Sequence, residues 1–464
     1  MFKNLNPFRI ILAILILFIP LYPKFPLTGV EGTYVAIRLD DIVIALCFVF
    51  FFIYQLKNHF SFFKQKITLL FIAYFIAILL STVNSILIYQ NNLPSVLLLN
   101  TFRRFEYISL FFITLNAIKN IKDFIYPYIF LLMAMLGIAV YGYGQKYFQF
   151  PVVSTMNEEF SKGQLLQMNV WTRISSTFAG HYDLAAYLSL VLIIIGAVTV
   201  LTKNKLLKIS SFIIFLIGFN LLTLTASRVS IFAFWGGIVL CFILLRRYWW
   251  ILPLSALVVY SFFSSGDLNQ RLLATINIVK TSTVKISSTP TIFPTPTTTV
   301  IAIIQKPVAV IIQKPTPTVF RHPAVEEVTP ADIDAGVARS GEIRFNVEWP
   351  RALNAFKKNP ILGTGLGSIT LATDNDYLRS LGESGLLGFM TLNIIFLYFF
   401  IKTVPLIKKR PTDLASQLSL IFLSVMASLL ANATFIDILE ASKVAYTFWI
   451  IMALYYQSLN LKHD

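Results

Sequence analysis

Charged residues are scarce in this sequence. Asp, Glu, Lys and Arg make up 13% of its 464 residues, about half of their share in soluble globular domains. Hydrophobic residues reach 56%, with 42 Phe among them. One water-soluble core cannot bury that much apolar surface, so the composition excludes an ordinary soluble domain and predicts an integral membrane protein.

Cysteine and histidine are also sparse. Cys47 and Cys241 both lie in apolar runs, and the four histidines are scattered, without an HExxH or CxxC pattern. This spacing provides no local disulfide partner and no set of metal ligands of the usual kind. The sequence therefore predicts neither a metal site nor a cofactor.

Long apolar runs dominate the chain instead. A bilayer-spanning helix needs roughly 17 to 25 mostly apolar residues. We predict about twelve spans, of which the first and ninth are short, at residues 10–22, 40–56, 67–89, 96–115, 124–143, 184–201, 207–225, 229–245, 250–263, 386–403, 416–431 and 442–457. Pro20, Pro23 and Pro26 follow the first apolar run where a signal peptide would have small residues, which favours a retained helix.

Basic residues outnumber acidic ones, 38 to 22, and are placed unevenly. With a cytoplasmic N-terminus, every cytoplasmic segment between spans is basic, whereas the short outer connections are nearly free of Lys and Arg. We therefore expect both termini in the cytoplasm. The net charge of +16 then anchors the protein to anionic membrane lipids and requires no nucleic-acid partner.

This topology divides the chain into three parts. Residues 1–263 hold nine spans and an outer loop at about 144–183, residues 264–385 form a large extracytoplasmic loop, and residues 386–464 hold the last three spans. Within the large loop, residues 281–320 are rich in Thr and Pro and repeat IIQKP, which is typical of extended chain. Residues 339–385 carry the motifs of this loop.

Polar side chains near the outer ends of the spans are candidate functional residues, because charge in hydrocarbon is costly. Arg103 and Glu106 lie three residues apart on one helical face, either as a structural ion pair or as part of a site. Arg228 follows several hydroxyl residues between the seventh and eighth spans. Arg173 and His181 precede the sixth span.

The end of the large loop contains two further motifs. Residues 344–367 read RFNVEWPRALNAFKKNPILGTGLG, which predicts a short amphipathic helix ending before Pro360 and then a glycine turn. Residues 374–388 read DNDYLRSLGESGLLG, in which Asn375, Asp376 and Tyr377 open a helix that becomes the tenth span. Arginine suits phosphate oxygens and a carboxylate can act as a base, so these motifs indicate an outer-face site for a lipid-linked phosphate compound.

The order of four motifs resembles the O-antigen ligase and polymerase family of membrane glycosyltransferases. The motifs are RISSTFAGHYDLAAYL at 173–188, TLTASRVSIFAF at 223–234, and the two segments quoted above. The resemblance implies an all-α, GT-C-like polytopic fold in the bacterial cytoplasmic membrane. It also implies metal-independent, inverting transfer of glycan from a polyprenyl-diphosphate-linked donor, at the outer face, to a hydroxyl of a glycan, lipid or protein acceptor.

The resemblance also implies residue roles. Arg173, Arg228 and Arg344 would contact the diphosphate or the substrate. Family ligases commonly begin the loop motif with His-Asn, where this chain has Asp374 and Asn375, our catalytic candidates. This departure leaves ligase and polymerase activities both open. Further candidates for substrate contact are Arg103, His181 and Tyr377.

Two other classes of protein share parts of this composition. A lipid-linked oligosaccharide flippase, or another polytopic transporter, should show repeated halves and charges lining a midplane cavity. Here the charged motifs crowd one side and no internal symmetry is visible. An envelope scaffold that works through the Thr/Pro-rich segment would leave the polar motifs near the sixth, seventh and tenth spans unexplained.

Overall fold

A computed structural model of the protein describes residues 6–29, 36–89, 93–153, 165–166, 173–264, 269, 273, 341–369, 372–409 and 411–461. The predicted Thr/Pro-rich segment, residues 281–320, lies outside these residues. A helix covers each of the twelve segments predicted as spans. They are α1 (Pro7–Leu21), α2 (Leu39–Lys57), α3 (Lys66–Ile88), α4 (Pro94–Leu115), α5 (Ile125–Phe148), α7 (His181–Leu201), α8 (Lys205–Leu224), α9 (Arg228–Leu244), α10 (Ile251–Ser264), α14 (Asp376–Lys408), α15 (Leu414–Asn432) and α16 (Ser442–Asn460).

Seven of the described helical segments are long and apolar enough to cross a membrane. They include α2, α3, α5 with the turn before it, α7, α8, α14 and α15. The apolar helices α1, α9 and α10 are shorter, as predicted for the first and ninth spans. The helices α4 and α16 fall outside both groups. These lengths and compositions support a multi-pass all-α membrane protein, and the number of twelve spans stays a prediction.

The remaining elements are short. β1 (Pro26–Gly29) pairs antiparallel with β2 (Ala36–Arg38), and β3 (Val152–Val153) pairs with β4 (Leu165–Leu166). One-turn 3₁₀ helices, η1 (Ser61–Lys64), η2 (Ile121–Phe124) and η3 (Tyr248–Trp250), precede α3, α5 and α10. The amphipathic helix predicted before Pro360 is α13 (Trp349–Lys358), and a π-helical turn, η4 (Arg344–Glu348), leads into it.

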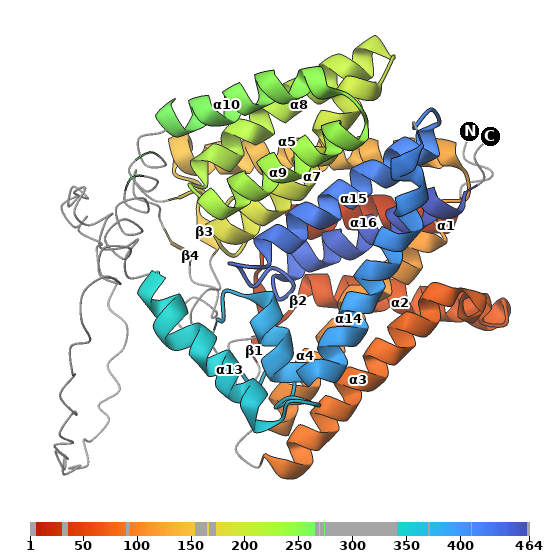
Figure 1. Ribbon diagram of the computed structural model, residues 1–464, viewed down its shortest axis with the longest axis vertical. Coiled ribbons are helices and arrows are strands. Elements are labelled where there is room, and N and C mark those ends of the chain that lie inside the picture. Colours follow the sequence, from red (N-terminus) through yellow and green to blue (C-terminus); the bar gives the residue numbers. More distant parts are fainter. Residues whose placement is uncertain are drawn as a thin grey trace, which may run out of the picture.

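The centre of the bundle is formed by α7, α15 and α16. α7 packs against α8, α9, α15 and α16 (Figure 1). Of the residues in its apolar membrane-spanning stretch, 83% are buried. It is apolar on all sides, as expected of a helix enclosed by others. α3 packs against α14 and α4 against α16, which brings segments far apart in the chain together.

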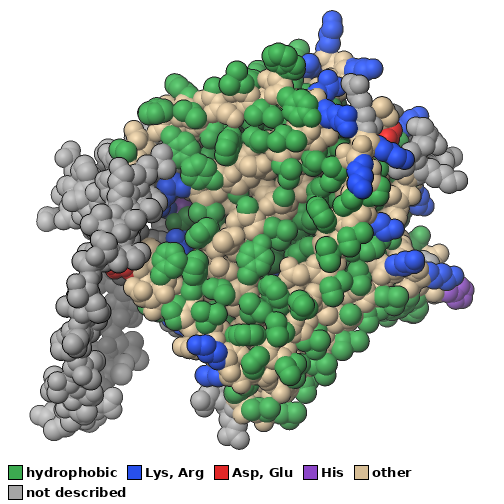
Figure 2. Space-filling view, viewed as in Figure 1, with side chains coloured by type: hydrophobic (Ala, Val, Ile, Leu, Met, Phe, Trp, Pro, Cys, Tyr) green, Lys and Arg blue, Asp and Glu red, His purple; other side chains and the backbone are tan. Residues whose placement is uncertain are grey.

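The two ends of the bundle differ in charge. Both chain termini lie at one end, and α13 lies at the opposite side (Figure 1). We call these the termini end and the α13 end. Lys and Arg side chains gather toward the termini end on the visible face (Figure 2). Which end faces the cytoplasm stays a prediction.

A break divides α14 near its start. Gly385 has φ 62° and ψ −170°, which interrupts the helix inside the segment where the sequence placed the entry into the tenth span. The predicted glycine turn fits against this break: Gly365 N–H donates to Glu383 O at 2.9 Å, and Leu386 N–H donates to Pro360 O at 2.8 Å. The turn therefore satisfies backbone groups that the break leaves without helical partners.

Candidate functional site

The predicted catalytic residue Asp374 forms an ion pair with Arg344 at the α13 end. The Arg344 Nε lies 2.8 Å and an Nη atom 2.7 Å from Asp374 Oδ2. Arg344 lies in η4, and Asp374 is the residue before the N-cap of α14. The ion pair therefore joins two segments that are 30 residues apart in the chain. Burial raises the pKa of Asp374 above its ordinary value, although Arg344 lowers it.

Arg173 is a second arginine near this ion pair. It is linked to Arg344 by Tyr182, which lies in the first turn of α7. An Arg173 Nη atom lies 2.6 Å from His181 Nε2, and its guanidinium lies 5.9 Å from the centre of the Tyr182 ring. The hydroxyl of Tyr182 interacts with the guanidinium groups of both Arg173 and Arg344. We refer to Arg173, His181, Tyr182, Arg344 and Asp374 as the Tyr182 cluster.

The backbone that carries Asp374 is held by reciprocal contacts with the α15–α16 connection. Asp437 accepts the N–H groups of Thr373 at 2.7 Å and Asn375 at 3.1 Å, on both sides of Asp374. In return, Asp376 Oδ2 accepts the N–H groups of residues 438 and 439 at 3.0 and 3.1 Å. Asp374 itself has a positive φ of 49°, which is uncommon outside glycine. Asp437 therefore fixes the position of the Asp374 carboxylate.

Glu348 is a further acidic group beside the Tyr182 cluster, and sequence reasoning did not single it out. It precedes α13, and its Oε2 atom is buried without a hydrogen-bond partner in the described part of the chain. Burial and the nearby Asp374 raise the pKa of Glu348 to about 7, against the opposing effect of Arg344. A carboxyl group of this kind can exchange protons near neutral pH.

A second group of charges pairs internally. Arg379 in α14 contacts Asp437 at 2.9 Å and Glu383 at 3.3 Å. Arg104 in α4 pairs with Glu440, which also lies 3.6 Å from Arg379. These two arginines have three carboxylate partners, so the group is compensated and joins α4, α14 and the α15–α16 connection. We interpret this ion network as structural.

A buried lysine holds the segment that carries Arg173. Lys443, in the first turn of α16, donates to Pro20 O at 3.0 Å and to Thr177 O at 2.7 Å. Its ammonium lies 4.7 Å from the centre of the Phe178 ring. The segment before α7 is thereby tied to α1 and α16, which positions Arg173 and Tyr182 at the base of the cluster.

The other predicted site residues have different surroundings. Asn375 caps α14 by accepting the Leu378 N–H at 2.9 Å, and the Tyr377 hydroxyl donates to Leu430 O in α15 at 2.8 Å. Arg228 is half-buried and begins α9, which packs beside α7. Arg103 is half-buried in α4. None of the contacts described for these four residues joins them directly to the Tyr182 cluster.

Glu106, the possible ion-pair partner of Arg103, also contacts α16. Glu106 accepts a hydrogen bond from the hydroxyl of Tyr446 in α16 at 2.7 Å. Arg103 also attracts Glu106 electrostatically. Because α16 lies against this face of α4, the helical spacing within α4 cannot reveal the contact with Tyr446.

The Tyr182 cluster is suited to bind an anion beside a base. Arg173 has no carboxylate within ion-pair distance among the described residues, so its planar guanidinium can donate hydrogen bonds to phosphate oxygens. The single carboxylate paired with Arg344 can receive a proton once that guanidinium turns to an anion. The fold and this site define a multi-pass membrane protein with an arginine-rich cluster at one end of its helix bundle.

A comparison with protein families relates part of the chain to a known family. A family model described as O-antigen ligase matches residues 213–393, from α8 into α14. The match covers less than half of the chain, and it supports the resemblance to the O-antigen ligase and polymerase family and a role in glycan transfer at a membrane. The matched region includes Arg228, Arg344 and Asp374, whereas Arg173 and Tyr182 precede it. No curated protein is similar enough to the chain to count as a match.

Several site residues lay outside the sequence prediction. Lys443 lies inside the last predicted span, where charge is costly and therefore informative, whereas Asp437 and Glu440 stand in the connection before it, where acidic residues are ordinary. Tyr182 sits next to the predicted His181. Glu348 gave no signal, because it lies in a loop where an acidic residue is ordinary.

Proposed function

We propose that this protein is a glycosyltransferase that moves glycan from a polyprenyl-diphosphate-linked donor to an acceptor hydroxyl at the outer face of the bacterial cytoplasmic membrane. One observation carries the proposal: two guanidinium groups, from Arg173 and Arg344, converge on Tyr182 next to the half-buried carboxylate of Asp374. A diphosphate needs positive charge, and an acceptor hydroxyl needs a base. The Tyr182 cluster supplies the positive charge and the base side by side, because Arg344 and Asp374 form an ion pair.

The arginines have the role of holding the leaving group. When the donor binds, its diphosphate competes with Asp374 for Arg344, and Arg173 supplies a second fork. Arg228 approaches from the start of the parallel helix α9, which begins at the same end of the bundle as α7. Because these guanidinium groups neutralise the developing charge, we propose that transfer needs no metal ion.

Asp374 has the role of the base. When the diphosphate binds Arg344, Asp374 loses its cationic partner and lies beside an anion. Both changes raise the pKa of Asp374, which makes its carboxylate a stronger base. It takes the proton of the acceptor hydroxyl, whose oxygen attacks the anomeric carbon. The bond from that carbon to the diphosphate oxygen breaks, the polyprenyl diphosphate leaves with the electron pair, and the configuration inverts.

The remaining predicted residues support this arrangement. Asn375 keeps Asp374 in place by capping α14, and Tyr377 anchors that helix to α15. His181 orients Arg173 through their 2.6 Å contact. Arg103, further along α4, is proposed to contact the donor on the membrane side. The extracytoplasmic location of the site follows from the predicted topology, in which the basic termini end is cytoplasmic.

The test is the product made by purified protein in lipid nanodiscs from a labelled polyprenyl-diphosphate glycan. Longer lipid-linked chains from donor alone identify a polymerase, and transfer only after addition of a glycan, lipid or protein acceptor identifies a ligase. We expect Arg228→Ala to reduce either product roughly 10²- to 10³-fold. EDTA should leave the rate unchanged.

The matched control is Lys357→Ala, which removes an exposed positive charge from α13 at the same end of the molecule. Its rate should equal that of the unaltered protein. Full activity in Arg228→Ala would remove that arginine from the mechanism. Movement of the labelled lipid across a bilayer without any new glycosidic bond would favour the transporter alternative and refute the transferase.

A further inference from the structure

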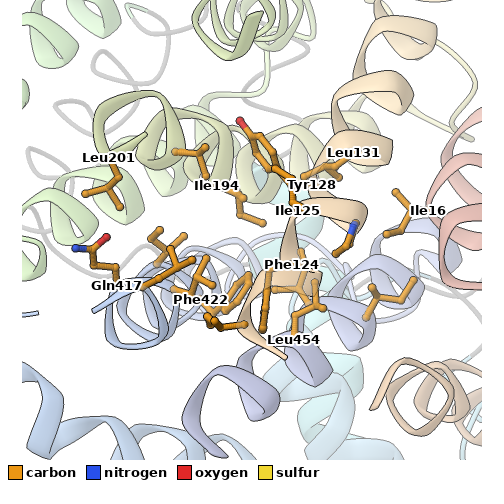
Figure 3. A pocket seen from close by; sticks show the side chains of 18 of the residues that line it. Ile16, Phe124, Ile125, Tyr128, Leu131, Ile194, Leu201, Gln417, Phe422 and Leu454 are labelled. Carbon is orange, nitrogen blue, oxygen red and sulfur yellow. The ribbon is translucent and has the colours of Figure 1, made fainter. Parts of the chain in front are cut away.

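A cavity of about 390 Å³ lies inside the bundle, apart from the Tyr182 cluster. Side chains of α1, α5, α7, α8, α15 and α16 line it, and nearly all of them are aliphatic or aromatic (Figure 3). Its volume falls in the range of small-molecule sites in proteins. An apolar cavity of this size among membrane-length helices calls for an apolar occupant.

The cavity is long and runs toward the termini end. On α7 its lining extends from Tyr187 to Leu201, a separation of fourteen positions that rises about 21 Å at 1.5 Å per residue. At the far end it reaches Gln417, near the start of α15, and Leu201, at the end of α7 (Figure 3). This length fits an extended acyl chain better than a compact molecule.

The end of the cavity adjoins a group of cations. A second cavity, of about 550 Å³, shares Leu201, Leu414 and Gln417 with the first and is also lined by Lys203, Arg246 and Arg247.

No acidic side chain lines either cavity. The nearby Asp413 is engaged in capping α15, where it accepts the Ser416 N–H at 2.8 Å. A positively charged mouth on an apolar channel therefore complements a lipid with an anionic headgroup.

We propose that this pair of cavities binds an anionic phospholipid, with one acyl chain in the apolar cavity and the phosphate against Lys203, Arg246 and Arg247. Basic pockets between membrane helices on the cytoplasmic side bind such headgroups, and each basic residue near a charged membrane surface strengthens binding. The site lies toward the opposite end of the bundle from the Tyr182 cluster, so it is separate from the proposed donor site. It does not depend on the proposed transfer reaction.

The experiment measures lipid binding to delipidated, detergent-solubilised full-length protein by native mass spectrometry. Phosphatidylglycerol and phosphatidylcholine of equal chain length are titrated in parallel. We expect the unaltered protein to prefer phosphatidylglycerol. The triple variant Lys203→Gln/Arg246→Gln/Arg247→Gln should bind phosphatidylglycerol about 100-fold more weakly, since three surface cations are lost. Its affinity for phosphatidylcholine should not change.

Two further variants make the result specific. Lys402→Gln/Lys408→Gln/Lys409→Gln removes three exposed positive charges near the end of α14 that line neither cavity, and should bind like the unaltered protein. Val198→Phe, which fills part of the apolar cavity, should weaken both lipids.

The proposal is overturned if the unaltered protein binds the two lipids equally, or if both triple variants behave alike. It is also overturned if the protein as purified retains a polyprenyl phosphate in place of phospholipid.

Discussion

At the scale of single residues, the acidic and basic side chains of the DNDYLRSLGESGLLG motif divide into separate roles. Asp374 faces Arg344 in the Tyr182 cluster, and Asp376 fastens the backbone beside it to the α15–α16 connection. Arg379 and Glu383 belong to the compensated ion network. Because only Asp374 combines a half-exposed carboxylate with an arginine that an anion can recruit, it is the one member of the motif to which we assign proton transfer.

The first prediction at this scale concerns Asp374 itself. Asp374→Asn removes the proposed base and should lower kcat roughly 10²- to 10⁴-fold with labelled donor. Asp374→His should retain part of the activity, because a neutral imidazole also accepts a proton. Both proteins must be inserted in the membrane at normal levels for the comparison. Undiminished transfer by Asp374→Asn would show that another group is the base.

The pH dependence of the rate distinguishes Asp374 from Glu348 as the catalytic base. A base must be ionised, so transfer is lost as the pH falls through its pKa. Since burial raises the pKa of Asp374, the acid limb of kcat/KM should lie above the ordinary aspartate range. If Glu348 is the base instead, the limb should fall near pH 7 and Glu348→Gln should abolish transfer.

At the scale of elements, the glycine turn and the break in α14 form one unit. Gly363 has a φ of 71°, and a Cβ atom placed on it would lie 2.4 Å from the carbonyl oxygen of Glu383. A Cβ atom on Gly385 would lie 2.4 Å from Ile361 O. The turn and the helix can approach this closely only because neither residue has a side chain. Their contact fixes the direction in which α14 leaves the loop that carries Asp374.

This contact predicts a loss of stability in Gly363→Ala. The positive φ alone costs about 1–2 kcal/mol for a residue with a Cβ atom, and the backbone must also move away. We expect a lower Tm for the solubilised protein and weaker transfer, because Asp374 shifts with the loop. Gly236→Ala is the control, since its Cβ in α9 would meet open space and should leave Tm unchanged or higher. Equal melting of the two variants would contradict this account of the turn.

At the scale of the whole molecule, the bundle has a basic end and an end with paired charges. The termini end carries exposed lysines and arginines (Figure 2), whereas the α13 end buries its arginines against carboxylates or tyrosine. This asymmetry matches the rule that cytoplasmic loops of membrane proteins are positively charged. Under the predicted topology, the proposed transfer site and the proposed phospholipid site lie toward opposite sides of one membrane.

Cysteine labelling tests this orientation. In a Cys47→Ala/Cys241→Ala background, Lys357→Cys on α13 should react with a membrane-impermeant maleimide in intact cells whose outer barrier has been opened. Lys408→Cys, at the end of α14, should react only after the cytoplasmic membrane is permeabilised. The reverse pattern would invert the topology and place the Tyr182 cluster in the cytoplasm.

The sequence by itself determined the helices of this protein, because apolar length, proline position and glycine clusters act within a few residues of where they stand. It predicted the twelve helical segments, the helix before Pro360, the glycine turn and the start of α14 at Asn375. It also pointed to Arg344 and Asp374, although not to their ion pair.

Only the tertiary structure decided which charges meet. Arg104 pairs with Glu440 across 336 residues of chain, and Asp437 positions Asp374 from the far side of two membrane-length helices. The cavity with its cationic mouth is likewise shared by six helices. In a buried, weakly solvated bundle an unpaired charge is costly, so the packing of distant helices selects the partners, and sequence spacing does not encode that packing.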